Sequence, residues 1–449
     1  MRIVIGLGVV MALALGSCAP ASPSKPAGSG GQEARTGVAA SGVEQVDAAT
    51  QGMIDRMLER VSGMRGLSRV GVVRGRVIDR ATMIRQVQEQ VRGQVPPGAI
   101  RGEQLFLSSF GFIPEDFDYE GQVYRLIESQ LAGYYDPERK ALFIMEDLGG
   151  SEVEVTLAHE LVHALQDQHY DLGSRLKYQQ NANDKQAAIH CLAEGDATSL
   201  MLDFTLEPGG GQAFEVPDEQ LRLGLVAGMG MSSDVAGFPR VIRESLLAPY
   251  VDGVLFVHGL RRRGGWELVD EAWKQPPSTT EQVLHLEKYM AREPAEQVEG
   301  VPAPSAQGWQ VVHQEVYGEQ GLRIAFEDWL PRRAAARAAE GWAGDKAIVW
   351  ENRDLGVIAA AWRIRFDVGE LEPSQEAKEA FTLVASAKGG GGVPSVCWVT
   401  QTGRAVLALW QGREVVLLSG PGEKGDPSKG GGCDELGVWG QRVSNRAGN

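Results

Sequence analysis

The chain has few cysteines, few histidines and no excess of positive charge, and each shortage narrows its possible functions. Its 449 residues include 44 Lys and Arg against 59 Asp and Glu, which gives a net charge of -15. Because binding to nucleic acid needs a basic face, we expect no nucleic-acid partner. The acidic surface favours solubility instead.

The N-terminus carries an apolar run, Ile3 to Leu15, that follows Arg2 and is too short to span a bilayer comfortably. A basic start, an apolar core and small residues after it are typical of an export signal. The sequence Leu15-Gly16-Ser17-Cys18 resembles the bacterial lipoprotein signal, in which the Cys becomes the lipid-modified N-terminus. The alternative is an ordinary cleaved signal followed by a chance Cys.

This resemblance implies a signal peptide over residues 1–17, a lipid anchor at Cys18 and a protein held on a membrane of the bacterial cell envelope. Residues 18–42 are rich in Ser, Gly, Ala and Pro and are predicted to form a flexible tether. Three cysteines remain, in a compartment that permits disulfides. We expect Cys397 and Cys433 to pair and Cys191 to be a buried free thiol.

Length and a hydrophobic content of 43% predict two or three domains. Residues 43–335 show mainly helical periodicity, with few strands before residue 300, and residues 340–449 read as a smaller α+β domain. The predicted strands of that domain are 347–350, 357–366, 396–400, 406–410 and 414–418, with a helix over 374–388. The glycine-rich stretches 389–392 and 430–432 lack the context of a phosphate-binding loop.

The segment His159-Glu160-Leu161-Val162-His163 is the most informative motif. On a helix both imidazoles point to one side and can reach one metal ion, with Glu160 near the same ion. With 7 His in the chain, a chance match is roughly a one-in-a-hundred event. A strand over 141–145 precedes the helix, and Ser151 begins the Ser-x-x-Glu pattern of a capping box. We therefore expect the helix to start there and to run to about residue 168. The edge of that strand can bind an extended substrate if the strand is not interior.

A catalytic zinc usually takes three protein ligands, so a third must be found. Glu194, in a helix predicted over 184–204, is the favoured candidate, and the adjacent Gly195 indicates close packing of that helix. His169 has the spacing of a third histidine, but Gln166 stands where that pattern needs a Gly. His190 shares a face with Glu194 and is the remaining candidate, but we expect it to be a buried, hydrogen-bonded histidine or to contact a metal ligand.

Two histidines and a downstream Glu resemble the gluzincin division of the zincin metallopeptidases. The resemblance covers about residues 140–205 and implies an α+β chain with a mainly helical zincin-like domain, one Zn²⁺ on His159, His163 and Glu194, and Glu160 as general base. Many gluzincins have an Asp four residues after the Glu, where this chain has Thr198. Which group orients the imidazoles is therefore open, with Asp167 as one candidate. His285 and Tyr289 are the candidates for stabilising the oxyanion.

The function that these features predict is a membrane-anchored zinc peptidase that hydrolyses a peptide or protein substrate. Two alternatives stay open. One is an inactive zinc-binding lipoprotein of zincin fold with a structural or interaction role. The other is a metal-independent binding lipoprotein in which the motif arose by chance.

Overall fold

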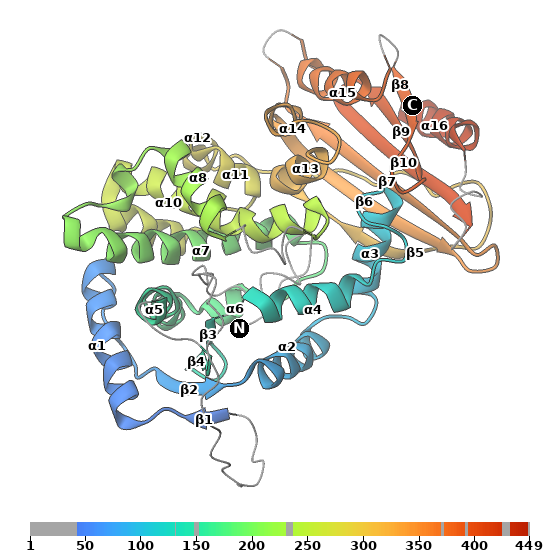
Figure 1. Ribbon diagram of the computed structural model, residues 1–449. Helices are drawn as coiled ribbons and strands as arrows, with labels where there is room; N and C mark the ends of the chain where they lie inside the picture. The colour runs from blue at the N-terminus through green and yellow to red at the C-terminus, as the bar shows by residue number, and fades with distance from the viewer. Residues whose placement is uncertain are drawn as a thin grey trace.

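The first part of the chain arranges helices around a small sheet (Figure 1). The computed structural model describes residues 43–130, 132–147, 152–229, 237–369, 372–390, 394–423 and 432–447, so the predicted signal peptide, Cys18, the tether and Ser151 lie outside the described residues. The elements up to residue 291 are β1 (Val43–Gln45), α1 (Ala48–Arg65), β2 (Arg74–Ile78), α2 (Arg80–Gln94), α3 (Ala99–Ser109), α4 (Tyr119–Gln130), β3 (Gly133–Asp136), β4 (Ala141–Met145), α5 (Glu152–Tyr170), α6 (Leu172–Arg175), α7 (Asn183–Leu206), η1 (Glu207–Gly209), η2 (Ala213–Glu215), α8 (Asp218–Met229), α10 (Arg240–Lys274), α11 (Thr280–Leu284) and α12 (Leu286–Ala291).

The four short strands form one sheet in the order β1-β2-β4-β3. β2 and β4 are parallel, with Arg74 opposite Ala141, and the other two pairs are antiparallel. The sequence predicted β4 with its observed bounds, but not its three neighbours. Because β4 has a partner on each side, its edge cannot receive a substrate. The edge strand next to it is β3.

The motif helix α5 lies between α1, the small sheet and α7 (Figure 1). Its apolar side chains Leu161, Val162 and Leu165 are fully buried and pack with Leu58 of α1 and Leu142 of β4. The face turned to α7 carries His159 and His163. A helix buried on nearly all sides holds its side chains in fixed positions, which a metal site requires.

Helices α7 and α10 cross in backbone contact. A Cβ at Gly195 would lie 2.1 Å from the carbonyl oxygen of Gly253, and one at Gly253 would lie 2.1 Å from that of Cys191. Gly195 therefore allows α7 to pack closely against α10. The sequence had suggested instead that it lets α7 pack closely against the motif helix. The crossing fixes α7, and with it Glu194, from the side opposite α5.

The last part of the chain is a six-stranded antiparallel sheet in the order β5-β6-β7-β10-β9-β8. Its elements are β5 (Trp309–Glu315), α13 (Gly318–Phe326), α14 (Arg332–Ala339), β6 (Trp342–Asn352), β7 (Val357–Phe366), α15 (Gln375–Ala387), β8 (Ser395–Val399), β9 (Ala405–Gln411), β10 (Glu414–Glu423) and α16 (Cys433–Ala447). Alternate residues of β7 face opposite sides: Trp362 packs in the core with α3, α13, α14 and α15, whereas Ala361 packs in the core with α16. The chain is thus α+β, as predicted.

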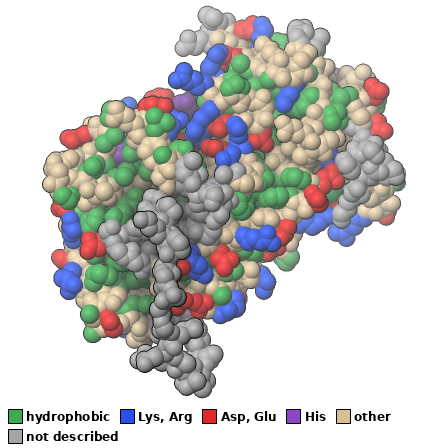
Figure 2. All heavy atoms as spheres, viewed as in Figure 1, with side chains coloured by type: hydrophobic (Ala, Val, Ile, Leu, Met, Phe, Trp, Pro, Cys, Tyr) green, Lys and Arg blue, Asp and Glu red, His purple; other side chains and the backbone are tan. Residues whose placement is uncertain are grey.

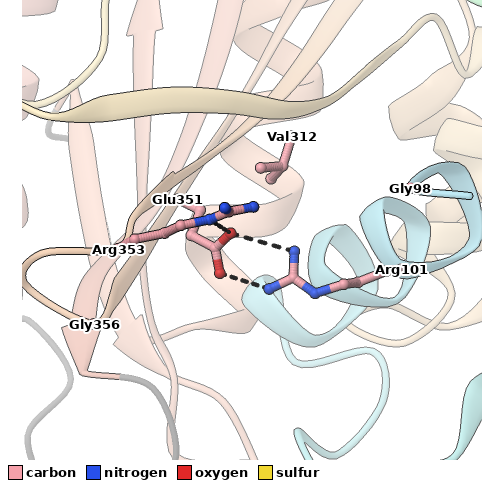
Figure 3. Close-up of a pocket in the computed structure, with 6 residues that line it drawn as sticks. All are labelled: Gly98, Arg101, Val312, Glu351, Arg353 and Gly356. Atoms are coloured by element: carbon pink, nitrogen blue, oxygen red, sulfur yellow. Dashed lines mark hydrogen bonds and ion pairs between the residues drawn. The ribbon is translucent and has the colours of Figure 1, made fainter.

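The two parts share a continuous core and an ion pair at their junction. Phe106 of α3 stacks on Tyr317 and meets Trp362 edge-on. Nearby, Arg101 of α3 binds Glu351 of β6 at 2.6 Å, in a surface cleft where Arg353 contacts the same carboxylate (Figure 3). The predicted boundary near residue 335 put β5 in the first domain. β5 instead pairs with β6 and belongs to the large sheet.

The disulfide prediction is confirmed: Cys397 and Cys433 are bonded, which ties α16 to β8, and Cys191 is free and buried. Among the described residues, no helix is long and apolar enough to cross a membrane. On the face that Figure 2 shows, acidic and basic side chains are interspersed.

Candidate metal centre

Helix α5 brings His159 and His163 together, one turn apart. Their Nε2 atoms lie 3.1 Å from each other, and both side chains are buried. The third group comes from α7, which packs against α5: Glu194 Oε2 lies 3.1 Å from His159 Nε2 and 3.5 Å from His163 Nε2. Three ligand-type atoms from two helices therefore form a small triangle.

The size of this triangle fits one tetrahedral zinc ion. Zinc binds imidazole nitrogen and carboxylate oxygen at about 2.0–2.1 Å, so two ligands of one tetrahedral ion lie about 3.3 Å apart. The three observed separations bracket that value. Two imidazoles and one carboxylate are also the donor types of known catalytic zinc sites. The residues fit the ion without rearrangement.

The groups around the triangle favour one positive charge beside the Glu194 carboxylate. Burial would raise the pKa of Glu194, but its contacts with His163, His159 and His190 hold that pKa well below its usual range. Burial lowers the pKa of His159. Burial acts the same way on His163, but Glu194 outweighs it and raises that pKa to about 9. The site is thus built to hold one cation, a proton or a metal ion, beside Glu194.

His190 contacts the other oxygen of the Glu194 carboxylate. Its Nε2 lies 3.2 Å from Oε1, one helical turn before Glu194 on α7. This contact leaves Oε2 directed at His159 and His163. His190 therefore lies beside a candidate ligand, where the sequence placed it.

Gln166, which the sequence reasoning did not assign a role, orients His163. Its Nε2 donates to Ala193 O at 3.0 Å and to Asp196 Oδ2 at 3.2 Å. Since both of these atoms only accept, the amide oxygen of Gln166 must face His163 Nδ1, 2.9 Å away. Nδ1 of His163 then carries a proton, so Nε2 is the nitrogen that a metal ion in the triangle can bind. The i, i+3 spacing from His163 to Gln166 was the available signal.

Asp196 anchors this arrangement in the interior. It accepts from Arg65 Nε at 2.6 Å and from Trp273 Nε1 at 2.8 Å, and the Arg65 and Asp196 side chains are fully buried. Arg65 also reaches Asp270 at 2.8 Å. A buried charge pair with this many partners is held rigidly, so the position of Gln166 is fixed by α1, α7 and α10 together.

Glu160 lies on the same helix, fully buried, with Oε2 accepting from Tyr135 N of β3 at 2.8 Å. Asp167, the residue predicted from the sequence as a candidate for orienting an imidazole, does not bond to either histidine of the triangle. It accepts from Tyr135 Oη at 2.9 Å and from Lys140 Nζ at 2.5 Å. Asp167 therefore ties α5 to the β3–β4 hairpin.

The rejected third histidine points away from the triangle. His169 is exposed, and its Nε2 lies 2.7 Å from Ser68 O. Nor does the structure bring the candidate oxyanion donors to the site. His285 Nε2 lies 2.9 Å from Glu319 Oε1, and Tyr289 is buried with its hydroxyl donating to Gln275 O at 3.0 Å. Both polar groups are held by other parts of the fold, which the sequence alone did not show.

An apolar cavity of about 430 Å³ opens beside His159. Tyr250 of α10 lines it, with its ring centre 6.2 Å from that of His159. Thr198, one turn after Glu194, also lines it and is buried. The cavity gives the triangle an adjoining space in which part of a substrate can lie.

A second group of metal-type ligands has a different explanation. Glu281, Glu293 and Asp367 lie close together, but Lys288 Nζ contacts all three, at 2.6, 3.2 and 2.6 Å. The ammonium group already supplies the positive charge that these carboxylates need.

Comparison with known proteins adds one finding. Residues 306–426 match a family described as "Domain of unknown function (DUF8575)". No curated protein and no solved structure matches the chain. The matched stretch begins just before β5 and covers all six strands of the large sheet, and it contains none of the triangle residues.

Proposed function

We propose that the protein is a zinc-dependent hydrolase of peptide bonds with a gluzincin-like site. The observation that carries this proposal is the triangle of His159 Nε2, His163 Nε2 and Glu194 Oε2, with separations of 3.1 to 3.5 Å. Its size, its donor types and the orientation of His163 by Gln166 all suit zinc.

The residues around the triangle have separate tasks in this proposal. Bound zinc supplies a Lewis acid that polarises the substrate carbonyl and lowers the pKa of water. Glu160 accepts a proton from the attacking water and passes it to the leaving amine. The N–H of Tyr135 holds Glu160 in place, and β3 is the edge strand from which that N–H comes.

Tyr250 replaces His285 and Tyr289 as the candidate that stabilises the oxyanion. It lines the cavity next to His159, whereas the other two side chains are engaged elsewhere. A phenol at this position can donate to a carbonyl oxygen as negative charge develops there.

The predicted lipid anchor at Cys18 completes the proposal. A hydrolase tethered by residues 18–42 would act on peptides or proteins at the membrane of the bacterial cell envelope. The disulfide between Cys397 and Cys433 is consistent with an oxidising compartment outside the cytoplasm.

The test combines metal analysis with two substitutions at the site and one control. Purified protein should hold one zinc ion per chain, and Glu194→Ala should weaken its binding. Glu160→Gln should keep the zinc and lose hydrolysis of a generic protein substrate by at least about a hundredfold. Glu154→Gln, on the exposed face of the same helix, is the matched control and should change neither.

Each other outcome selects an alternative. Protein that binds zinc but cleaves nothing, before or after these substitutions, would be the inactive zinc-binding lipoprotein. Protein that binds no zinc would leave the motif without a metal function. Unchanged cleavage by Glu160→Gln would refute Glu160 as the base.

A further inference from the structure

The cavity beside His159 is a groove between two helices. Residues 198, 201, 202, 205 and 206 of α7 line one wall, and residues 220, 221, 224, 225 and 228 of α8 line the other. Each set has the spacing of a single helix face. From its first to its last residue, each set spans eight helical rises of 1.5 Å, or about 12 Å. The groove is therefore longer than a pocket for one side chain needs to be.

The two ends of the groove differ. His159, Val155 and Tyr250 close the end next to the triangle, and Thr198 lies there one turn beyond Glu194. At the far end lies Leu206, which is 37% exposed. A molecule in the groove thus has one end at the candidate metal centre and its other end near solvent.

The walls offer very few hydrogen-bonding groups. Met201, Leu202, Leu221 and Leu225 supply apolar surface, and the Thr205 hydroxyl donates to Met201 O of its own helix. An extended peptide in such a groove would bury N–H and C=O groups without partners, at a cost of several kcal/mol each in an apolar site. A hydrocarbon chain has no such groups.

We propose that this groove binds an unbranched hydrocarbon chain, so that the hydrolase acts on a substrate carrying an acyl or alkyl chain next to the cleaved amide bond. The proposal rests on the proposed function for the cleavage, but the binding of the chain depends on the groove alone. A fully extended chain advances about 1.3 Å per carbon, so about nine or ten carbons fill 12 Å. Thr198, a polar side chain of α7 at the inner end of the groove, lies where the head group of the hydrocarbon chain would begin.

Gly224 allows the groove to be shortened without a clash. A Cβ at this position meets no atom within 4 Å, although the residue lines the groove. A phenylalanine there would occupy the groove, and replacing a helical Gly does not harm α8. Gly63, on the exposed side of α1, also has no atom within 4 Å and gives the matched control Gly63→Phe.

The test uses calorimetry to measure how straight-chain alcohols, from 1-butanol to 1-dodecanol, bind to the full-length protein. The series is run on the protein as purified and again after its metal has been removed with a chelator. Each added CH₂ should raise the affinity about fourfold up to nine or ten carbons, and not beyond. Cyclooctanol should bind at least tenfold more weakly than 1-octanol. Gly224→Phe should end the rise at a shorter chain, whereas Gly63→Phe should follow the wild type.

Affinity that does not grow with chain length, equal binding of cyclooctanol and 1-octanol, or a Gly224→Phe series identical to the wild type would overturn the proposal. None of these results depends on zinc. A protein that binds the alcohols but holds no zinc would support the proposed groove and refute the proposed zinc hydrolase. A protein that cleaves peptides but does not bind the alcohols would support the hydrolase and refute the groove.

Discussion

Replacing Gln166 with methionine tests whether the tautomer of His163 is set by its neighbour. Methionine has nearly the same length and shape, so it fills the space but removes the amide. Three contacts are lost: those to His163 Nδ1, Ala193 O and Asp196 Oδ2. Asp196 keeps its bonds to Arg65 and Trp273, so α7 stays in place.

The expected loss is in zinc affinity more than in folding. Without an acceptor at Nδ1, His163 can place its proton on Nε2, the atom that must be bare to bind metal. Removing the group that orients a metal-binding imidazole typically weakens binding about 10- to 100-fold, or roughly 1.4 to 2.8 kcal/mol. The Ala193 carbonyl left without this donor adds about 1 kcal/mol to the loss of folding stability.

A competition titration against a chromophoric chelator measures the zinc affinity, and thermal unfolding of the metal-free protein measures stability. The matched control is Gln168→Met on the same helix. The amide of Gln168 also bonds to the backbone, by accepting from Val70 N and Gly71 N, but away from the triangle. If both variants bind zinc as tightly as the wild type, or if both lose the same affinity, Gln166 does not orient His163.

Three further predictions concern the fold. Gly195→Ala should lower the free energy of unfolding, measured in urea, by about 1–3 kcal/mol because the new Cβ meets backbone of α10. The control Gly63→Ala adds a Cβ that meets no atom and should raise that free energy by up to about 1 kcal/mol. Equal effects of the two substitutions would contradict the close crossing of α7 and α10. Burial raises the pKa of Glu103 from 4.5 to about 8, so the folded state keeps a proton that the unfolded chain releases, and this stability is complete below pH 4.5 and lost as the pH rises to about 8. Glu103→Gln should therefore flatten the decline of stability between pH 5.5 and 7.5 by up to about 1.4 kcal/mol per pH unit, and an unchanged slope would refute this. Reducing the bond between Cys397 and Cys433, which closes 36 residues, should lower stability by about 3–4 kcal/mol, with the double Ser variant insensitive to reductant.

Features with a local cause were predictable from the sequence. The motif helix, the helix of Glu194 and strand β4 follow from periodicity and apolar runs within a few residues of each element. The break in α10 at Gly264 and Gly265, where the φ angle of Gly265 is 65°, follows from the Gly-Gly pair itself. In each case the neighbouring residues carry the determining preference.

Features that depend on distant partners were missed. β2 (Arg74–Ile78) contains two arginines and is a strand because β4, more than sixty residues later, supplies its hydrogen bonds. β5 was not predicted as a strand for the same reason, since its partner β6 follows two intervening helices. Local propensity is weak in such segments, and long-range pairing decides.

The site shows the same division in its side chains. His159, Glu160 and His163 come from one helix, so their spacing alone places them together. Glu194 requires two helices to meet, and a carboxylate near a glycine was only a partial signal, because Gly195 turned out to contact α10. The orientation of His163 goes one step further: Gln166 can present its oxygen only because Asp196 and Ala193 O occupy its nitrogen. The role of Gln166 depends on the groups that its amide nitrogen bonds, and these lie on another helix. Sequence spacing cannot reveal such a role, so the Gln166 substitution tests the part of the site that only the structure shows.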